Sequence, residues 1–125
     1  MSPSSVLRII ITPLVLVVLF FAGTARADNI DRLIGQLTKS SDYKVRISAA
    51  LSLSKLRDAR AVPAFIRALK DSDKTVRGVA AASLGKSLDS RSSSKTRSLA
   101  LASLKVAAAK DSNAFVRRQA QKAYD

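Results

Sequence analysis

Apolar residues recur at helical spacing along most of the chain after residue 29. Three segments repeat one pattern: SDYKVRISAALSL at 41–53, SDKTVRGVAAASL at 72–84 and SNAFVRRQAQKAY at 112–124. In each segment an apolar or small residue returns every three or four positions, which marks one face of an α-helix. Each segment also begins with Asp or Asn shortly before the apolar positions, as a helix N-cap requires. The pattern therefore predicts three helices of related sequence.

The three segments align without gaps, which makes them an internal repeat. They share a capping Asp or Asn, a Val-Arg pair and an Ala three residues after the Arg. The aligned positions are Asp42, Asp73 and Asn113; Val45, Val76 and Val116; Arg46, Arg77 and Arg117; and Ala49, Ala80 and Ala120. An internal repeat of this kind is typical of solenoids, in which each unit buries its apolar face only against its neighbours.

A second helix is predicted after each of the first two repeated helices. Residues 57–61 have the composition of a turn, and Pro63 then stands at the start of a helix, where its missing N–H costs nothing. After Gly85, which is interpreted as a helix-end signal, the polar segment 87–94 (SLDSRSSS before Lys95) is expected to be an inserted loop. Residues 95–110, rich in Ala and Leu, predict a long helix.

One further helix is predicted ahead of the repeats, over 29–39, with Asp28 or Asn29 as its cap. The expected fold is all-α: a short α-solenoid of stacked antiparallel helical hairpins with about six helices. Its parts are an N-terminal capping helix at 28–40, a first repeat at 41–71, a second repeat at 72–111 with the inserted loop 87–94, and a C-terminal half repeat at 112–125.

The first 27 residues have the three parts of a secretory signal peptide. Arg8 is the only charge before an apolar run at 9–22, and the small residues of Ala25-Arg26-Ala27 follow. The run of 14 residues is short of the ~20 that a membrane-spanning helix needs. We therefore expect cleavage after Ala27 and an exported protein, periplasmic or extracellular. The alternative is an uncleaved N-terminus, which would be its one route to a membrane.

The net charge narrows the class of partner. The chain has 22 Lys and Arg against 9 acidic residues, a net charge of +13, which becomes +11 when Arg8 and Arg26 leave with the signal peptide. Such a protein is attracted to acidic proteins and to polyanions, including cell-wall polymers, anionic lipids and nucleic acids. Export and the scarcity of aromatic residues for base stacking disfavour nucleic acid.

The composition also disfavours catalysis. The chain has no Cys and no His, so it lacks thiol chemistry, the usual general base and the commonest zinc ligands. Asp71 and Asp73 are two carboxylates close in sequence, but their positions at a helix start favour capping and contacts between repeats. The sequence therefore predicts a protein that is not an enzyme, with no catalytic residues, cofactor or metal.

The first repeated helix and the residues that follow it carry a family resemblance. VRISAALSLSKLRDARAVPAFIRALKDSD at 45–73 resembles a HEAT repeat of the phycobilisome-lyase-like kind, and VRGVAAASLG at 76–85 resembles the next first helix. The resemblance covers about residues 29–124. It implies a stack of helical hairpins in which repeated Asp and Arg residues bond between neighbouring units. These ladder residues are Arg46, Arg77, Arg117, Asp71 and Asp111.

Two basic surfaces follow from the predicted stack. The edge formed by the turns within hairpins, called the basic rim below, collects Lys55, Arg57, Arg60, Lys86, Arg91, Lys95 and Arg97, against Asp58 and Asp89. The inner face formed by the second helices carries Arg67, Lys70, Lys105 and Lys110. We expect the rim to bind the partner of an exported interaction scaffold, an acidic protein. The alternative is a structural protein that binds a polyanion through charge alone.

Overall fold

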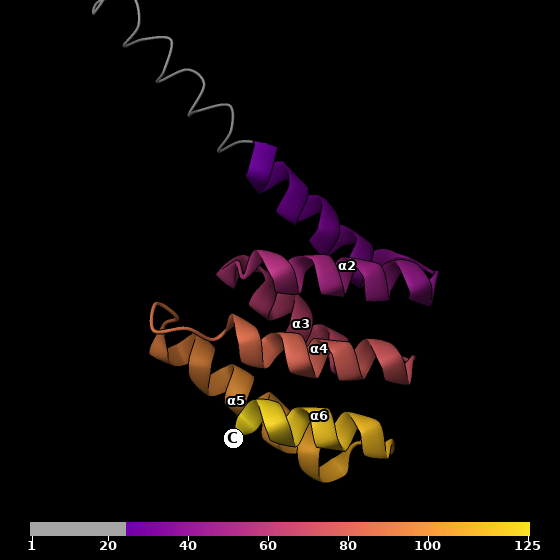
Figure 1. Ribbon diagram of the computed structural model, residues 1–125, viewed down its shortest axis with the longest axis vertical. Coiled ribbons are helices and arrows are strands. Elements are labelled where there is room, and N and C mark those ends of the chain that lie inside the picture. The colour runs from indigo at the N-terminus through magenta and orange to yellow at the C-terminus, as the bar shows by residue number, and fades with distance from the viewer. Residues whose placement is uncertain (1–24) are drawn as a thin grey trace, which may run out of the picture. The chain divides into compact units, whose positions relative to one another are not determined.

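The computed structural model describes residues 25–125 (Figure 1). The predicted signal peptide therefore lies outside the described residues, except for its last three. The chain separates into two units that divide after Asp31. Each is described by itself: residues 25–31 are helical, and the solenoid described below comprises residues 32–125.

Six α-helical segments and one short 3-10 helix make up the described residues, which contain no strand, so the all-α prediction is confirmed. Residues 25–39 are helical. The elements that follow are α2 (Tyr43–Leu56), η1 (Ala59–Ala61), α3 (Val62–Ala68), α4 (Lys74–Ser87), α5 (Ser94–Lys110) and α6 (Ala114–Tyr124).

The helices of residues 43–125 form two layers (Figure 1). The repeated helices α2, α4 and α6 lie side by side in one layer, and α3 and α5 lie behind them in a second. Each second helix packs most closely against the repeated helix that follows it: α3 against α4, and α5 against α6. The inner face of the stack is the layer of second helices.

Side-chain caps fix where the repeated helices begin. Asp42 accepts a hydrogen bond from the backbone N–H of Lys44, and the equivalent Asp73 and Asn113 each accept from two backbone N–H groups of their own helices. Ser93 caps α5 in the same way. Each cap satisfies N–H groups that the first helical turn leaves without a partner.

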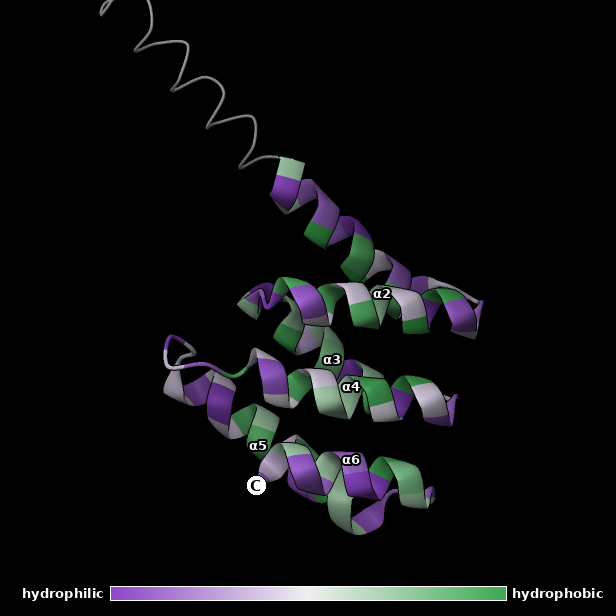
Figure 2. Cartoon of the chain, viewed as in Figure 1, coloured by the Kyte–Doolittle hydropathy of each residue, from purple (hydrophilic) through white to green (hydrophobic). Residues whose placement is uncertain are grey.

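The core lies between the two layers and is built from the repeated apolar positions. Hydrophobic and hydrophilic residues are interspersed along the helices (Figure 2), and the buried apolar residues recur at helical spacing. Ala49, Ala80 and Ala120 are fully buried or nearly so and let the repeated helices approach closely. The largest fully buried side chain is Phe65 of α3.

Two predictions about helix boundaries were wrong. Residues 25–28 are already helical, so neither Asp28 nor Asn29 is an N-cap; Ala25 and Ala27 are strong helix formers and extend the helix backward. In the segment 57–61, expected to be a turn, the last three residues form η1. Asp58 caps η1 by accepting from the Arg60 N–H.

The insertion in the second repeat is more helical than expected. The connection between α4 and α5 is 88–93, so Ser87 and Ser94 belong to helices and not to the predicted loop 87–94. This connection has six residues where the first repeat has two, 57–58. The 17 residues of α5 correspond to only twelve in the first repeat, 59–70. The insertion therefore lengthens the inner face more than it lengthens the loop.

Gly85 was expected to end a helix, but it lies inside α4, which continues to Ser87. Its function is to permit close packing between helices. A Cβ at Gly85 would lie 2.8 Å from the Cβ of Ala123 and 3.1 Å from its Cα, so the backbone of α6 occupies the space. A side chain at this position would push α6 away from α4.

We expect Gly85→Ala to destabilise the fold by about 1 kcal/mol, although alanine is the better helix former by about 1 kcal/mol. Gly35 provides the matched control, because it is also helical and a Cβ there would meet nothing within 4 Å. Gly35→Ala should therefore stabilise by about 0.5–1 kcal/mol. Urea unfolding of both variants measures the difference, and equal stabilisation of the two would contradict the packing argument.

Candidate functional site

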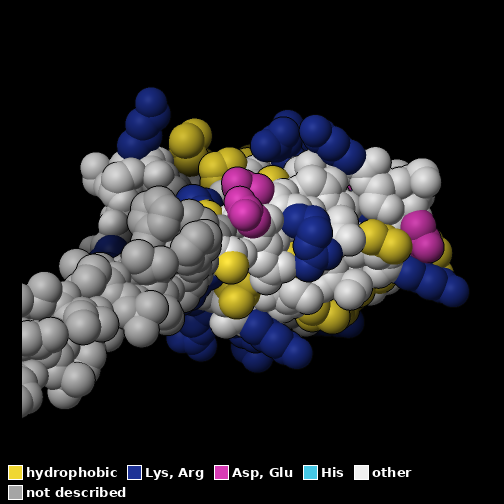
Figure 3. Space-filling view, turned by 90° about the horizontal axis from the view of Figure 1, so that it is seen from above, with side chains coloured by type: hydrophobic (Ala, Val, Ile, Leu, Met, Phe, Trp, Pro, Cys, Tyr) yellow, Lys and Arg dark blue, Asp and Glu magenta, His cyan; other side chains and the backbone are white. Residues whose placement is uncertain are grey.

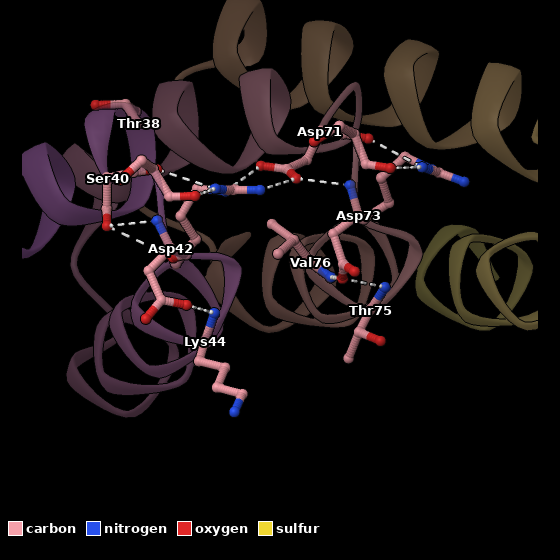
Figure 4. Close-up of polar contacts among 12 residues, drawn as sticks. Thr38, Ser40, Asp42, Lys44, Asp71, Asp73, Thr75 and Val76 are labelled. Atoms are coloured by element: carbon pink, nitrogen blue, oxygen red, sulfur yellow. Dashed lines mark hydrogen bonds and ion pairs between the residues drawn. The ribbon is translucent and has the colours of Figure 1, made fainter.

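Arg46 joins the first repeat to the turns on both sides of it. Its Nε and Nη2 donate to the two carboxylate oxygens of Asp71 at 2.8 and 2.9 Å, and its Nη1 donates to the carbonyls of Ser40 and Ser41 (Figure 4). Both side chains of the pair are about nine-tenths buried. The hydrogen bonds to Asp71 raise the pKa of Arg46 above its ordinary value. The arrangement is a bidentate ion pair that sets how two repeats stack.

Arg77 makes the same contacts one repeat further along. Its Nε and Nη2 donate to Asp111 at 2.9 and 3.2 Å, and its Nη1 donates to the carbonyls of Asp71 and Ser72. Burial alone would raise the pKa of Asp111, but the hydrogen bonds from Arg77 and the Asn113 N–H, with nearby positive charge, outweigh it and lower the pKa below its ordinary value. Asp111 is therefore an ionised, structural carboxylate.

Arg117, the third predicted ladder residue, makes the backbone contacts of the other two but no ion pair. Its Nη1 donates to the carbonyls of Asp111 and Ser112 at 2.7 and 3.1 Å, as in the other two repeats. No carboxylate of the described residues contacts its Nε or Nη2. The ladder thus consists of two ion pairs and one arginine that presents the same geometry without a carboxylate.

The carboxylates considered for chemistry are both engaged in structure. Asp71 accepts from Arg46 and from the backbone N–H of Asp73, while the Asp73 side chain caps α4 through the N–H groups of Thr75 and Val76. Residues 25–125 contain no group of three or more acidic, His or Cys side chains placed to hold a metal ion. These carboxylates hold the repeats together.

All seven residues of the basic rim are exposed. Two of the arginines bond to aspartates of their own loops: Arg60 lies 2.9 Å from Asp58 and Arg91 lies 2.9 Å from Asp89. Hydrogen bonds from Arg91 lower the pKa of Asp89, which stays ionised. The loop pairs thus remove two charges of each sign from the rim.

The remaining five rim residues have no carboxylate partner among the described residues. One of them, Arg97, donates from Nη2 to the backbone carbonyl of Asp89 and keeps its charge. Lys and Arg side chains lie at separate places around the face that Figure 3 shows, and acidic side chains are few there. The five free rim cations are Lys55, Arg57, Lys86, Lys95 and Arg97. They supply an exposed positive surface.

A groove runs along the inner face between α3 and α5, with a volume of about 440 Å³. Leu69 and Ala107, both buried, lie at its base, and Ile66 lines it from α3. Leu99 and Val106 of α5 expose more than half of their side chains to it. Large apolar side chains this exposed in a groove are typical of a binding surface.

The α5 wall of the groove is one continuous stripe of the helix. Its members recur alternately after three residues and after one, which keeps them on one helical face: Leu99, Ala102, Ser103, Val106, Ala107 and Lys110. The stripe runs over the twelve residues from Leu99 to Lys110, which is about 16 Å or three helical turns. A groove of that length accommodates about three turns of a helical ligand.

Positive charge surrounds the groove. Lys70 and Lys110 line it, and both are exposed. Arg67 and Lys105, also exposed, lie on the same two helices. The one acidic residue in the lining is Asp111, whose carboxylate is bound by Arg77. The groove therefore offers an apolar base and cationic edges.

The four cations of the inner face were predicted from the sequence, but the groove itself was not. The signal was present, because Leu99, Ala102 and Val106 repeat at helical spacing on the predicted helix 95–110. Such a stripe would ordinarily be assigned to the core. Only the structure shows that Leu99 and Val106 lie exposed in a groove and not in the core.

The helices form two layers (Figure 1), and a ladder of two ion pairs joins the successive repeats. This architecture defines a short α-solenoid. A family model for HEAT repeats matches residues 30–125, so the chain belongs to the HEAT-repeat family. Proteins of this family are generally protein-interaction scaffolds, and the fold is typically not enzymatic. The comparison with curated proteins found no match. Among the described residues, no helix is both long and apolar enough to cross a membrane.

Proposed function

We propose that this protein is an exported HEAT-repeat scaffold that binds an acidic amphipathic segment of a partner protein in the groove between α3 and α5. The groove carries the proposal, because Leu99 and Val106 stand exposed beside buried Leu69. An amphipathic helix would cover these side chains with its apolar face. Acidic residues flanking that face would meet Lys70 and Lys110.

Export is part of the proposal and rests on the sequence of residues 1–27. The assignment to the phycobilisome-lyase-like kind of HEAT repeat is also part of it, and rests on the motifs at 45–73 and 76–85. These motifs indicate the kind of repeat and no activity, because proteins that share a fold need not share a function. The function that we propose is binding, without catalysis.

A second candidate function is favoured by the free cations of the basic rim. Lys55, Arg57, Lys86, Lys95 and Arg97 would hold a cell-wall polymer, an anionic lipid surface or a nucleic acid by charge alone. Binding of this kind is weakened steeply by salt and accepts one polyanion in place of another. Groove binding has a large apolar contribution and persists in salt.

The experiment that tests the proposal captures proteins from a detergent-solubilised envelope fraction on the immobilised chain, at low and at high salt. We expect one acidic protein to be retained at high salt. The double variant Leu99→Ser/Val106→Ser should reduce its retention on the order of 30-fold, since each half-exposed side chain contributes about 1 kcal/mol when covered. The substitutions should leave folding intact, because both side chains are mostly exposed.

Two control variants separate the candidate surfaces. Leu51→Ser removes an equally exposed apolar side chain from α2, outside the groove, and should not affect capture. Lys55→Glu/Lys86→Glu reverses two charges on the basic rim. Salt-labile capture of many acidic components that this rim variant abolishes would establish the second candidate function. Capture that survives in the groove variant at high salt would contradict the first.

A further inference from the structure

Lys95 extends the α5 wall of the groove by one helical turn. It precedes Leu99 by four residues, which places it on the same helical face, about 6 Å further along the axis. Its side chain is exposed. The beginning of α5 is held in place, because Ser93 caps it and Arg97 bonds to the backbone carbonyl of Asp89. Lys95 therefore adds a cation where the apolar stripe ends, on the side of the basic rim.

The opposite end of the groove is cationic as well. Lys70 and Lys110 line it. They directly precede Asp71 and Asp111, which lie at the C-terminal ends of α3 and α5. Arg77 brings these two ends together, because it donates to the backbone carbonyl of Asp71 and to the carboxylate of Asp111. The two lysines therefore lie at one edge of the stack, and the apolar stripe runs from that edge toward the beginning of α5.

The two cationic ends are separated by a fixed length of apolar surface. Lys95 and Lys110 are fifteen residues apart on α5, which is about 22 Å or four helical turns. Between them the exposed side chains of Leu99 and Val106 face the groove. A carboxylate of the ligand placed against these two side chains would lose water without gaining a partner, at a cost in free energy. The groove therefore favours acidic residues at the ends of a ligand and disfavours them in its middle.

We infer that the groove selects a helical segment of another protein that carries one acidic residue at each end of an apolar stripe, with the two acids about four turns apart. One carboxylate pairs with Lys95 and the other with Lys70 and Lys110. The inference rests on the proposed function of the groove and adds to it the charge pattern of the partner. It makes Lys95 a specificity-determining residue, because recognition then depends on the spacing of two charges and not on the net charge alone.

A second copy of this chain is a poor occupant of the groove. None of the helices α2 to α6 contains an acidic residue, and the helix at 25–39 carries two aspartates that are only three residues apart. No helix of the described residues thus has the charge spacing that the groove selects. The net charge of +13 also makes two copies repel one another. The occupant is therefore a helix of a different, acidic protein.

The test titrates the nitrogen-15-labelled full chain with a blocked synthetic peptide and follows the backbone amides by NMR. The probe is a helical peptide of 19 residues, built from alanine and glutamine, with leucine at its positions 5, 9 and 12 and glutamate at positions 2 and 16, all on one helical face. The control peptide has the same composition but carries its glutamates at positions 3 and 18, on the opposite face. We expect saturable shifts at Leu99 and Val106, and about tenfold tighter binding of the probe than of the control.

Substitutions in the chain assign each charge of the probe to its partner. Lys95→Gln should weaken binding about threefold, and changing one particular glutamate of the probe to glutamine should remove that effect. Lys110→Gln should be coupled in the same way to the other glutamate. Lys105→Gln is the matched control, because Lys105 is an exposed lysine of the same helix that does not line the groove. An effect of Lys95→Gln no larger than that of Lys105→Gln, or equal binding of the two peptides, would overturn the inference.

The groove variant Leu99→Ser/Val106→Ser distinguishes failure of this inference from failure of the proposed function. Probe binding that this variant abolishes, but that does not depend on Lys95, would overturn the inference and leave the proposed function in place. Probe binding that survives in the groove variant would contradict both. Self-association of the chain that the groove variant abolishes would also overturn the inference, since the occupant would then be a second copy.

Discussion

Replacing Arg77 with alanine should lower the free energy of unfolding by about 3 kcal/mol, because it leaves the carboxylate of Asp111 buried without its partner. The side chains of this pair are only 15% and 8% exposed, so water compensates the charge poorly. For a domain of this size, such a loss lowers the midpoint of thermal unfolding on the order of 15 °C. Calorimetry or thermal circular dichroism measures it directly.

Arg117→Ala is the matched control for this prediction. It removes the same two hydrogen bonds to backbone carbonyls and no ion pair, so it should cost only about 1 kcal/mol. Equal losses in the two variants would mean that the carbonyl contacts, and not the ion pair, stabilise the ladder. Unchanged stability of Arg77→Ala together with lost partner binding would instead assign Arg77 to the binding surface.

The pH dependence of the stability lost in Arg77→Ala shows whether the carboxylate of Asp111 is the cause of that loss. Because the folded protein lowers the pKa of Asp111 below its ordinary value, the stabilisation from this carboxylate is complete above the ordinary pKa and is lost as the pH falls through the lower pKa of the folded state. The difference in the free energy of unfolding between the original chain and Arg77→Ala should therefore become smaller in acid. A gap that is constant from pH 6 to pH 3 would exclude the carboxylate as its source.

The sequence was sufficient for the parts of the fold that repeat. The aligned Val, Arg and Ala positions predicted α2, α4 and α6 together with their capping residues, because helical periodicity and capping are local properties. The ends of the stack were less predictable. The helix that contains residues 25–28 extends past the expected caps, and Gly85 owes its role to Ala123, a contact between residues far apart in sequence.

The candidate surfaces could be predicted only in part, because exposure depends on neighbouring helices. The four cations of the inner face were identified from the helical pattern, but the exposed Leu99 and Val106 were not, since an apolar stripe does not reveal which helix covers it.

Replacing Phe65 with alanine should be the most damaging substitution in the inner layer, at about 4 kcal/mol. Phe65 is fully buried and belongs to α3, which has only seven residues. A helix this short is held by its side-chain packing and not by its own hydrogen bonds. The loss is a large part of the ~5–14 kcal/mol expected for about 94 residues, so urea unfolding should show a markedly lower midpoint.

The adjacent residue separates this stabilising role from binding. Ile66 lines the groove and is only partly buried, so Ile66→Ala should cost about 1 kcal/mol of stability and yet weaken capture of the groove partner. Phe65→Ala should weaken capture only in proportion to the fraction of unfolded chain. If Ile66→Ala destabilised the fold as much as Phe65→Ala and left capture unchanged, Ile66 would belong to the core and the α3 wall of the groove would have no part in binding.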